Sequence, residues 1–256
     1  MTTTAPLAGA GIVVTRPVHQ ADRLCAMIEA AGGRALRFPA LFIAPPADAA
    51  AAREAAGAAA SDDWLIFTST NAVEGMDSLG GIPERPRRAA IGRATAGALT
   101  ALGRDVHCLP AGGHDSESLL ATPPFDKPAG LEIAIVRGEG GRPLLGDALA
   151  ERGARVHYVE VYRRERPAVD PSPLLEWWRR GEVSAIAVAS GETLTNLVSM
   201  LNEEGRRFLA GSQLVVPSAR VVKMATPLHL ERPPLISGAG DQAMVQTLAR
   251  WWGHHD

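Results

Sequence analysis

The stretch Trp64-Leu65-Ile66-Phe67-Thr68-Ser69 is an apolar run that ends in two hydroxyl side chains, and the helix-period segment Asn71–Leu79 follows it directly. A short apolar run followed by an amphipathic segment is typical of a strand-to-helix unit in a parallel sheet. The same alternation begins at Gly11–Val14, which the helical segment Ala21–Ala31 follows. The total of about ten expected strands is too many for one simple sheet. Further strands are expected at Arg88–Ile91, Val106–Leu109, Leu131–Val136, Ala154–Tyr162, Ser184–Val188, Leu214–Val216 and Pro234–Ile236.

The unit that contains Ser69 recurs 121 residues later in the chain. Phe67-Thr68-Ser69 corresponds to Val188-Ala189-Ser190, and each stretch ends a strand with a serine and opens a helix. A fixed offset of this kind indicates an internal repeat, so the sequence predicts two similar halves. Small loop insertions explain a later match that departs from the offset by a few residues. The other matches are Arg16 with Arg137, Gly32 and Arg34 with Gly153 and Arg155, and, at the shifted offset, Ile91–Thr95 with Val216–Arg220.

Two extended stretches, Arg34–Ala44 and Arg155–Arg166, are longer than a typical strand. We expect them to pair as a ribbon that carries the chain from one lobe to the other and back. The lobes are then residues 1–37 with 168–256, and residues 38–166. The predicted fold class is α/β, with two similar parallel-sheet, flavodoxin-like lobes, a two-stranded linker and a cleft between the lobes.

The composition bounds the protein class. With 46% hydrophobic and 21% charged residues among 256, the chain can bury a substantial core and should fold without disulfides or a structural metal. Its two cysteines have no spacing typical of a disulfide framework or a zinc site. Its net charge of −2 gives no positive electrostatic field of the kind that nucleic-acid binding needs. The segment Met1–Gly11 lacks the features of a signal peptide, and no apolar run approaches the ~20 residues that span a bilayer. We expect a cytoplasmic monomer that contacts neither nucleic acid nor membrane.

Polar residues cluster where the predicted strands end and helices begin. Ligands of open α/β sheets bind at this edge, where free backbone N–H groups and helix dipoles favour anions. We therefore expect a small polyanion as the ligand. The alternative for the hydroxyl residues is helix capping, and for the arginines it is a surface salt bridge. The candidate binding residues are Thr15, Arg16, Thr68, Ser69, Asn71, Arg93, Thr95, Ser116, Arg137, Ser190, Ser218 and Ser237.

The motifs of cofactor and metal enzymes are missing from the sequence. It contains no GxxxxGK[ST] phosphate loop, and no GxGxxG follows a strand with an acidic partner about 20 residues on. The seven histidines show no HExxH or comparable ligand spacing, and no GxSxG elbow is present. We expect no cofactor and no metal.

Tyr162 is the candidate catalytic residue. It is one of two tyrosines and lies near the end of the second long stretch, from which we expect it to project toward the cleft. A neutral phenol can donate a proton to a leaving group. The alternative is a tyrosine at the edge of the core, whose ring packs against apolar residues while its hydroxyl is exposed to solvent.

Six short segments occur in an order that is typical of one family: Val13–Pro17, Gly32–Pro39, Asp63–Ser69, Ala90–Gly92 with Ala94-Thr95, Asp115–Glu117 and Val159–Tyr162. Through them the sequence resembles the uroporphyrinogen-III synthase family along nearly its whole length. The last third departs more from the family pattern, since Val216–Arg220 stands where a glycine-containing turn is common.

The resemblance implies two α/β lobes that bind the linear tetrapyrrole hydroxymethylbilane between them. It implies ring closure with loss of water and inversion of ring D, through an azafulvene and a spiro intermediate, with Tyr162 assisting departure of the hydroxyl. The eight carboxylates of that substrate suit the polar turns. We also expect transient contact with the enzyme that supplies hydroxymethylbilane. The first alternative function is that of a non-catalytic two-lobe protein that binds a small anion. The second alternative is a nucleotide-dependent transferase.

Overall fold

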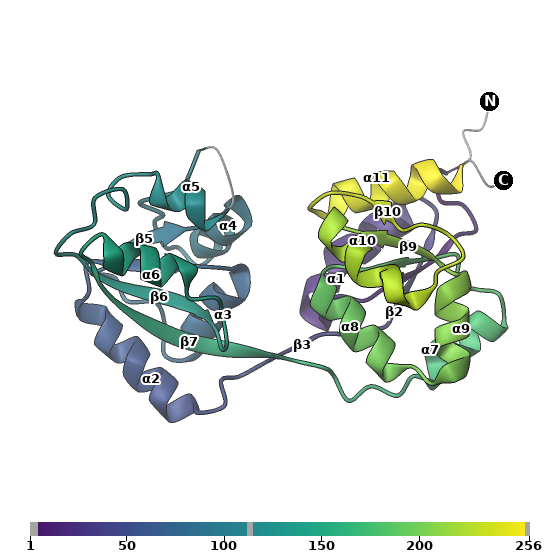
Figure 1. The fold of residues 1–256 in the computed structure, drawn as a ribbon, viewed down its shortest axis with the longest axis horizontal. Helices are drawn as coiled ribbons and strands as arrows, with labels where there is room; N and C mark the ends of the chain where they lie inside the picture. The colour runs from purple at the N-terminus through teal and green to yellow at the C-terminus, as the bar shows by residue number, and fades with distance from the viewer. Residues whose placement is uncertain (1–4, 112–114, 254–256) are drawn as a thin grey trace. The chain divides into compact units, whose positions relative to one another are not determined.

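The computed structural model describes residues 5–111 and 115–253, which form two compact units (Figure 1). The first unit comes from Met1–Phe42 and Glu165–Asp256, and the second is Ile43–Arg164. Each unit has one five-stranded sheet, so the prediction of an α/β fold with two parallel sheets is confirmed.

The first unit has the sheet order β10-β9-β8-β1-β2, and every adjacent pair is parallel. Its elements are β1 Gly11–Val14, α1 Val18–Ala30, β2 Arg34–Arg37, α7 Ser172–Arg179, β8 Ala185–Ala187, α8 Gly191–Met200, α9 Glu203–Gly211, β9 Gln213–Val216, α10 Ala219–Ala225, the 3₁₀ turn η2 Thr226–Leu228, β10 Leu235–Ile236 and α11 Asp241–Trp252.

The second unit has the sheet order β3-β7-β6-β4-β5, in which β7, β6, β4 and β5 are parallel. Its elements are β3 Phe42–Ala44, α2 Ala49–Ala58, the 3₁₀ turn η1 Ala59–Ser61, β4 Trp64–Phe67, α3 Thr70–Ser78, β5 Arg87–Ala90, α4 Arg93–Ala101, α5 Ser116–Leu120, β6 Glu132–Gly138, α6 Leu144–Glu151 and β7 Arg155–Glu165.

The internal repeat is visible in the strand registers. Ile12 pairs with Ala185 between β1 and β8, and Ile133 pairs with Trp64 between β6 and β4. The two registers coincide when residue numbers are shifted by 121, and the same shift relates β1–β2 to β6–β7. Thus β2, β1, β8 and β9 correspond to β7, β6, β4 and β5. Each sheet therefore combines the first two strands of one repeat with the later strands of the other: β1 and β2 lie with β8 and β9, and β6 and β7 lie with β4 and β5.

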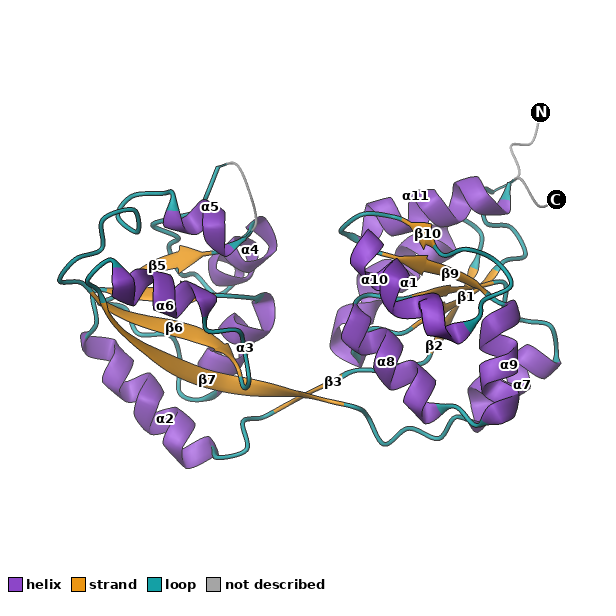
Figure 2. Ribbon diagram, viewed as in Figure 1, coloured by secondary structure: helices purple, strands orange, loops and turns teal. Residues whose placement is uncertain are grey.

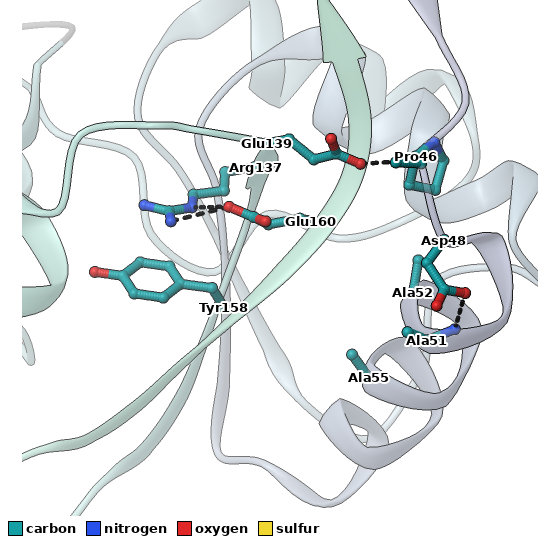
Figure 3. Close-up of a pocket in the computed structure, with 10 residues that line it drawn as sticks. Pro46, Asp48, Ala51, Ala52, Ala55, Arg137, Glu139, Tyr158 and Glu160 are labelled. Carbon is teal, nitrogen blue, oxygen red and sulfur yellow. Dashed lines mark hydrogen bonds and ion pairs between the residues drawn. The ribbon is translucent and has the colours of Figure 1, made fainter.

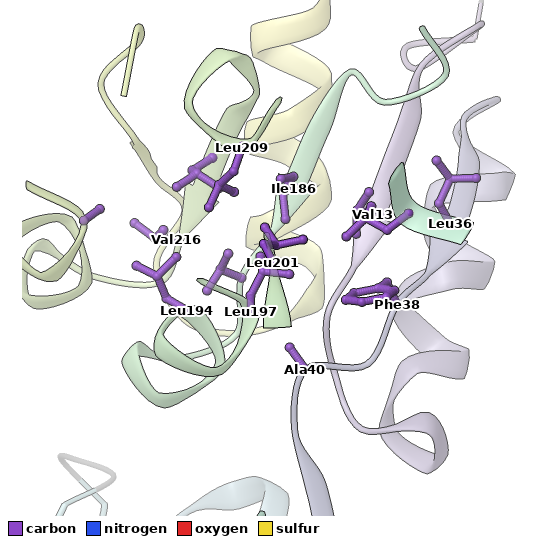
Figure 4. Packing of buried hydrophobic residues seen from close by; sticks show 14 of the residues in the cluster. Val13, Leu36, Phe38, Ala40, Ile186, Leu194, Leu197, Leu201, Leu209 and Val216 are labelled. Atoms are coloured by element: carbon purple, nitrogen blue, oxygen red, sulfur yellow. The ribbon is translucent and has the colours of Figure 1, made fainter. Parts of the chain in front are cut away.

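Helices cover both faces of each sheet (Figure 2). Alternate strand residues point to opposite faces, so Val13 joins one buried cluster while Ile12 and Val14 join another. Leu65 and Phe67 are separated from Trp64 and Ile66 in the same way. Burial on both faces explains why the central strands β1, β4 and β8 read as continuous apolar runs. Figure 4 shows the cluster around Val13, which α8 and α9 complete with leucines.

Three expectations about strands were wrong. Arg34–Ala44 is not one long strand: β2 ends at Arg37 and β3 begins at Phe42, in the other sheet, and only β3 is adjacent to β7. Pro39, which has no N–H for a ladder, lies in the break. Val106–Leu109 contributes a single bridge, Ala89 to Cys108, rather than a strand.

The third error concerns the shifted match between the halves. The β4–β5 and β8–β9 registers align Ala90 with Val216, so Gly92 corresponds to Ser218. The sequence alignment had paired Ile91 with Val216 and was one residue out.

Candidate active site

In the second unit, hydroxyl residues gather at the carboxyl ends of β4 and β6. Thr68 Oγ1 donates a hydrogen bond to the carbonyl of Val136, at 3.1 Å. Ser69 is the N-cap of α3, and its Oγ accepts from the backbone N–H of Ala72 at 3.1 Å. The same Oγ lies 3.2 Å from the hydroxyl of Tyr162. Because Ser69 ends the strand and caps the helix, its position is set by both elements.

Tyr162 lies against this turn because of a β-bulge. Arg137 pairs with Glu160, but the next residue of β6, Gly138, pairs with Tyr162, so Val161 is left without an opposite residue. A bulge reverses the alternation of side chains along a strand. Val159, Val161 and Tyr162 therefore all belong to one buried cluster, and Tyr162 is only 2% exposed. Within this unit, Tyr162 is therefore enclosed by its own cluster.

Gly138 makes room for the tyrosine ring. A Cβ on Gly138 would lie 2.7 Å from Cε2 and Cζ of Tyr162, closer than carbon atoms can approach. The phenol oxygen also accepts a hydrogen bond from Nη2 of Arg164 at 2.9 Å, with the guanidinium 5.4 Å from the ring centroid. The sequence therefore places a cation, a phenol and a serine in one contiguous chain of contacts.

Arg137 lies at the end of β6 in an open pocket of about 410 Å³ (Figure 3). Its guanidinium contacts Glu160 Oε1 at 3.0 and 3.2 Å, stacks 3.6 Å from the ring of Tyr158 and donates to the carbonyl of Gly141 at 3.1 Å. Across the pocket, Glu139 Oε1 accepts from the N–H of Ala47 at 2.6 Å. The arginine is thus held in one orientation beside an opening lined by α2.

The remaining candidates of this unit lie at the same sheet edge. Asn71 is in the first turn of α3. Arg93 begins α4 and is exposed, whereas Thr95 in the same turn is 5% exposed. Ser116 begins α5, whose cap is the carboxylate of Asp115, which accepts from the N–H of Ser118 at 2.9 Å.

In the first unit, the candidates occupy the equivalent edge. Arg16 forms an ion pair with Asp241 at 2.6 Å, and Ser190 caps α8 by accepting from the N–H of Thr193 at 3.1 Å. Ser218 is the N-cap of α10, without a side-chain cap bond, and Ser237 Oγ donates to backbone carbonyls of Gly238 and Val216. Thr15 is fully buried, and its hydroxyl donates to the carbonyl of Ala187 at 2.8 Å.

Comparison with known proteins identifies the family. Residues 22–233 match the family model described as uroporphyrinogen-III synthase HemD. The chain is 31% identical over 243 residues to the uroporphyrinogen-III synthase of Escherichia coli (strain K12), covering 93% of this chain and 99% of that protein. The chain belongs to the uroporphyrinogen-III synthase family. A family member from Synechococcus elongatus is 31% identical over 204 residues, 77% of this chain and 76% of that protein.

Solved structures of the uroporphyrinogen-III synthase family share the fold. A mutant of the enzyme from the extremely thermophilic bacterium Thermus thermophilus aligns with a TM-score of 0.60 at 22% identity, covering 96% of this chain and 100% of that one. The enzyme from Helicobacter pylori 26695 aligns with a TM-score of 0.59 at 15% identity, covering 93% and 97%. At these identities the likeness shows the fold.

For this member of the uroporphyrinogen-III synthase family, sequence reasoning missed two residues that lie against the candidate Tyr162. Gly138 lies in the glycine-containing stretch Arg137–Gly141, which matches no phosphate-binding motif, yet its lack of a side chain admits Tyr162. Arg164, two residues after Tyr162 on β7, contacts the phenol. No sequence signal revealed these contacts, because they depend on the bulge, and regular alternation predicts Tyr162 on the opposite face. Among the described residues, no group of three metal-ligating side chains occurs, and no helix is long and apolar enough to cross a bilayer.

Proposed function

We propose that this chain closes hydroxymethylbilane to uroporphyrinogen III, with loss of water and inversion of ring D, as a cyclising hydro-lyase of tetrapyrrole biosynthesis. The observation that carries the proposal is the 31% identity that extends over 99% of the Escherichia coli uroporphyrinogen-III synthase. A relationship over the whole length of that protein includes the strand ends at which the polar residues gather.

The chemistry of the substrate fits the residues at these strand ends. Hydroxymethylbilane brings its own reactive pyrroles and eight carboxylates, so the protein has to position it and stabilise charge. Arg16 and Arg137 are the equivalent cations of the two repeats, and Arg93 adds an exposed one. The helix N-termini that Ser69 and Ser190 open add partial positive charge. We propose these groups, with the other predicted turn residues, as carboxylate contacts.

The hydroxyl that leaves the substrate needs a proton, and Tyr162 is the acid proposed from the sequence. Its phenol lies with Ser69 and Arg164 at the end of β7. Proton donation from a positioned side chain contributes about 10²–10⁴-fold to the rate of such a step. The reaction requires no redox change, so substrate and side chains suffice for its balance.

The decisive experiment incubates the purified full-length chain with enzymatically generated hydroxymethylbilane and separates the uroporphyrin isomers after oxidation. We expect the type III isomer. The spontaneous product is type I, so type I alone at every protein concentration contradicts the proposal. Binding of the bilane without ring closure would then favour the alternative of a non-catalytic anion-binding protein.

We further propose that the protein works as a cytoplasmic monomer in transient contact with the enzyme that releases hydroxymethylbilane. The support is chemical: the bilane closes spontaneously to the wrong isomer, so a short transfer distance protects it. Light scattering of the purified chain tests the monomer. A type III fraction that stays constant as inert viscogen slows diffusion supports direct transfer, and a fraction that falls with viscosity contradicts it.

A further inference from the structure

Four groups of the second unit form a continuous hydrogen-bonded chain. Arg164 Nη2 donates to Tyr162 Oη at 2.9 Å, Tyr162 Oη and Ser69 Oγ are 3.2 Å apart, and the N–H of Ala72 donates to Ser69 Oγ at 3.1 Å. A guanidinium and a backbone N–H can only donate. Tyr162 Oη therefore accepts from Arg164, and Ser69 Oγ accepts from Ala72.

This arrangement leaves one hydroxyl hydrogen over. One of the two hydroxyl hydrogens joins Tyr162 to Ser69, and the other must point out of the chain. If Ser69 donated, the free hydrogen would lie on the phenol, which is 2% exposed. A buried donor without an acceptor costs about 1–3 kcal/mol. If Tyr162 donates, the free hydrogen lies on Ser69, which is only partly buried. Burial therefore favours the direction from Tyr162 to Ser69.

Features of the backbone position Tyr162 and Ser69 for a hydrogen bond in this direction. The bulge in β7 turns Tyr162 toward α3, and Gly138 leaves the space that its ring fills. The N-cap position fixes Ser69 Oγ against the first turn of α3. The tyrosine is thus enclosed, while the serine hydroxyl remains at the sheet edge where the other polar turns lie.

We propose that Ser69 is the catalytic acid that protonates the leaving hydroxyl, and that Tyr162 and Arg164 are positioning residues that supply Ser69 with its proton and set its direction. This inference rests on the proposed function. The substrate's C–O bond breaks with its electron pair on oxygen, and the Ser69 proton converts that oxygen to water. The pyrrole nitrogen keeps its hydrogen, and its electron pair forms the new double bond, which gives the cationic azafulvenium. The Tyr162 proton moves to Ser69. The phenolate, beside the Arg164 guanidinium, regains the proton that the substrate releases when ring closure restores the pyrrole.

The test compares Ser69→Ala, Ser69→Thr, Tyr162→Phe and the double variant Ser69→Ala with Tyr162→Phe, all in the full chain. Turnover is measured as formation of the type III isomer, and kcat and KM are determined separately. The matched control is Asn202→Ala, because Asn202 caps α9 with a 2.9 Å bond from the N–H of Gly205 and is an exposed residue of the other unit. It reports the effect of losing a cap alone.

We expect Ser69→Ala to lower kcat about 100-fold with KM nearly constant, Ser69→Thr to restore most of it, and Asn202→Ala to keep the wild-type rate. Tyr162→Phe should lower kcat by roughly tenfold, and adding it to Ser69→Ala should change nothing further, since residues that act as a unit are not additive. Circular dichroism confirms that each variant is folded.

Two results overturn the inference. One is a Ser69→Ala variant with the kcat of Asn202→Ala while Tyr162→Phe loses activity, which would mean that the phenol meets the substrate itself. The other is a double variant whose loss is the product of the single losses, which would make the two residues independent. A wild-type chain that yields only the type I isomer overturns the proposed function instead, and the wild-type reaction shows this before any variant is made.

Discussion

Ser69 and Ser190 occupy the same turn of the two repeats, yet their second contacts differ. Each serine caps a helix with a 3.1 Å hydrogen bond from the backbone N–H three residues later. The hydroxyl of Ser190 then lies 2.8 Å from Thr193 Oγ1, within its own helix. The hydroxyl of Ser69 instead meets Tyr162, which comes from another strand. The repeat supplies the cap in both units, and the surrounding residues give only one serine a link to a phenol.

The difference comes from two substitutions between the repeats. The residue equivalent to Thr193 is Ala72, which has no hydroxyl to offer Ser69, and the residue equivalent to Tyr162 is Leu41. The strand β7 also continues through its bulge to Glu165, whereas the equivalent β2 ends at Arg37. A duplicated turn can therefore keep its structural role in both copies while one copy gains a contact with a phenol from a longer neighbouring strand.

The largest effect on this comparison is expected from Gly138→Ala. The new Cβ would lie 2.7 Å from the ring of Tyr162 and must displace it from Ser69. We expect kcat to fall at least as far as in Tyr162→Phe, roughly tenfold or more, and the free energy of unfolding to fall by about 1–3 kcal/mol from overpacking. Isomer-resolved kinetics and urea unfolding measure the two effects.

The control for that change is Gly97→Ala, at an exposed helical position where a Cβ would meet nothing within 4 Å. It should raise stability by up to about 1 kcal/mol through helix propensity and leave kcat unchanged. A Gly138→Ala variant with wild-type kcat would show that the ring position is not needed.

The limits of sequence reasoning follow from the same residues. Apolar runs revealed the central strands of both sheets because these are buried on both faces, and a constant offset of 121 residues revealed the repeat that the registers share. The bulge at Val161 has no sequence signature, since alternation of side chains places Tyr162 with Tyr158 and Glu160 on the other face. The contacts of Tyr162 with Ser69 and Arg164 depend on that one extra residue, so the sequence could nominate Tyr162 as a candidate but could not predict its contacts.

The two equivalent arginines allow a second test of how alike the repeats are. Arg16 is paired with Asp241 at 2.6 Å, and Arg137 with Glu160 at 3.0 Å. If both bind substrate carboxylates, Arg16→Gln and Arg137→Gln should each raise KM roughly tenfold, the loss of one charge-assisted contact, with kcat less affected. Steady-state kinetics with generated bilane measures this. A variant with unchanged KM would assign that arginine to its ion pair alone.

A smaller effect is expected where Ser190 loses its local partner. Thr193 is fully buried, and Thr193→Val keeps its volume while removing the hydroxyl 2.8 Å from Ser190 Oγ. The free energy of unfolding should fall by about 1 kcal/mol, the net worth of one hydrogen bond. Urea unfolding measures it, and Thr195→Val, at an exposed position of the same helix where the hydroxyl donates to the carbonyl of Gly191 at 3.1 Å, is the matched comparison. Full stability of Thr193→Val would mean that the capping bond alone holds Ser190.

The smallest effect concerns the opposite end of β4, where the repeats differ in polarity. Asp62 is 7% exposed and lies 3.1 Å from Nε2 of His157, while the equivalent residues of the first unit, Val183 and Leu36, pack as apolar side chains. Burial raises the pKa of the Asp62 carboxyl, and the nearby His157 only partly opposes this. The folded chain therefore binds this proton more tightly than the unfolded chain.

The sign of the pH effect follows from that difference. Stability from Asp62 is fully present below the unfolded-chain pKa of about 4 and is lost as pH rises through the higher pKa of the folded state. Asp62→Asn should flatten this part of the profile and raise the free energy of unfolding at pH 7 by about 1 kcal/mol or less. Urea unfolding between pH 4 and pH 7 measures it, and Asn202→Ala, which removes no titratable group, should keep the wild-type slope. An unchanged slope in Asp62→Asn would contradict the prediction, because it would show that burial of the Asp62 carboxyl contributes nothing to the pH dependence of stability.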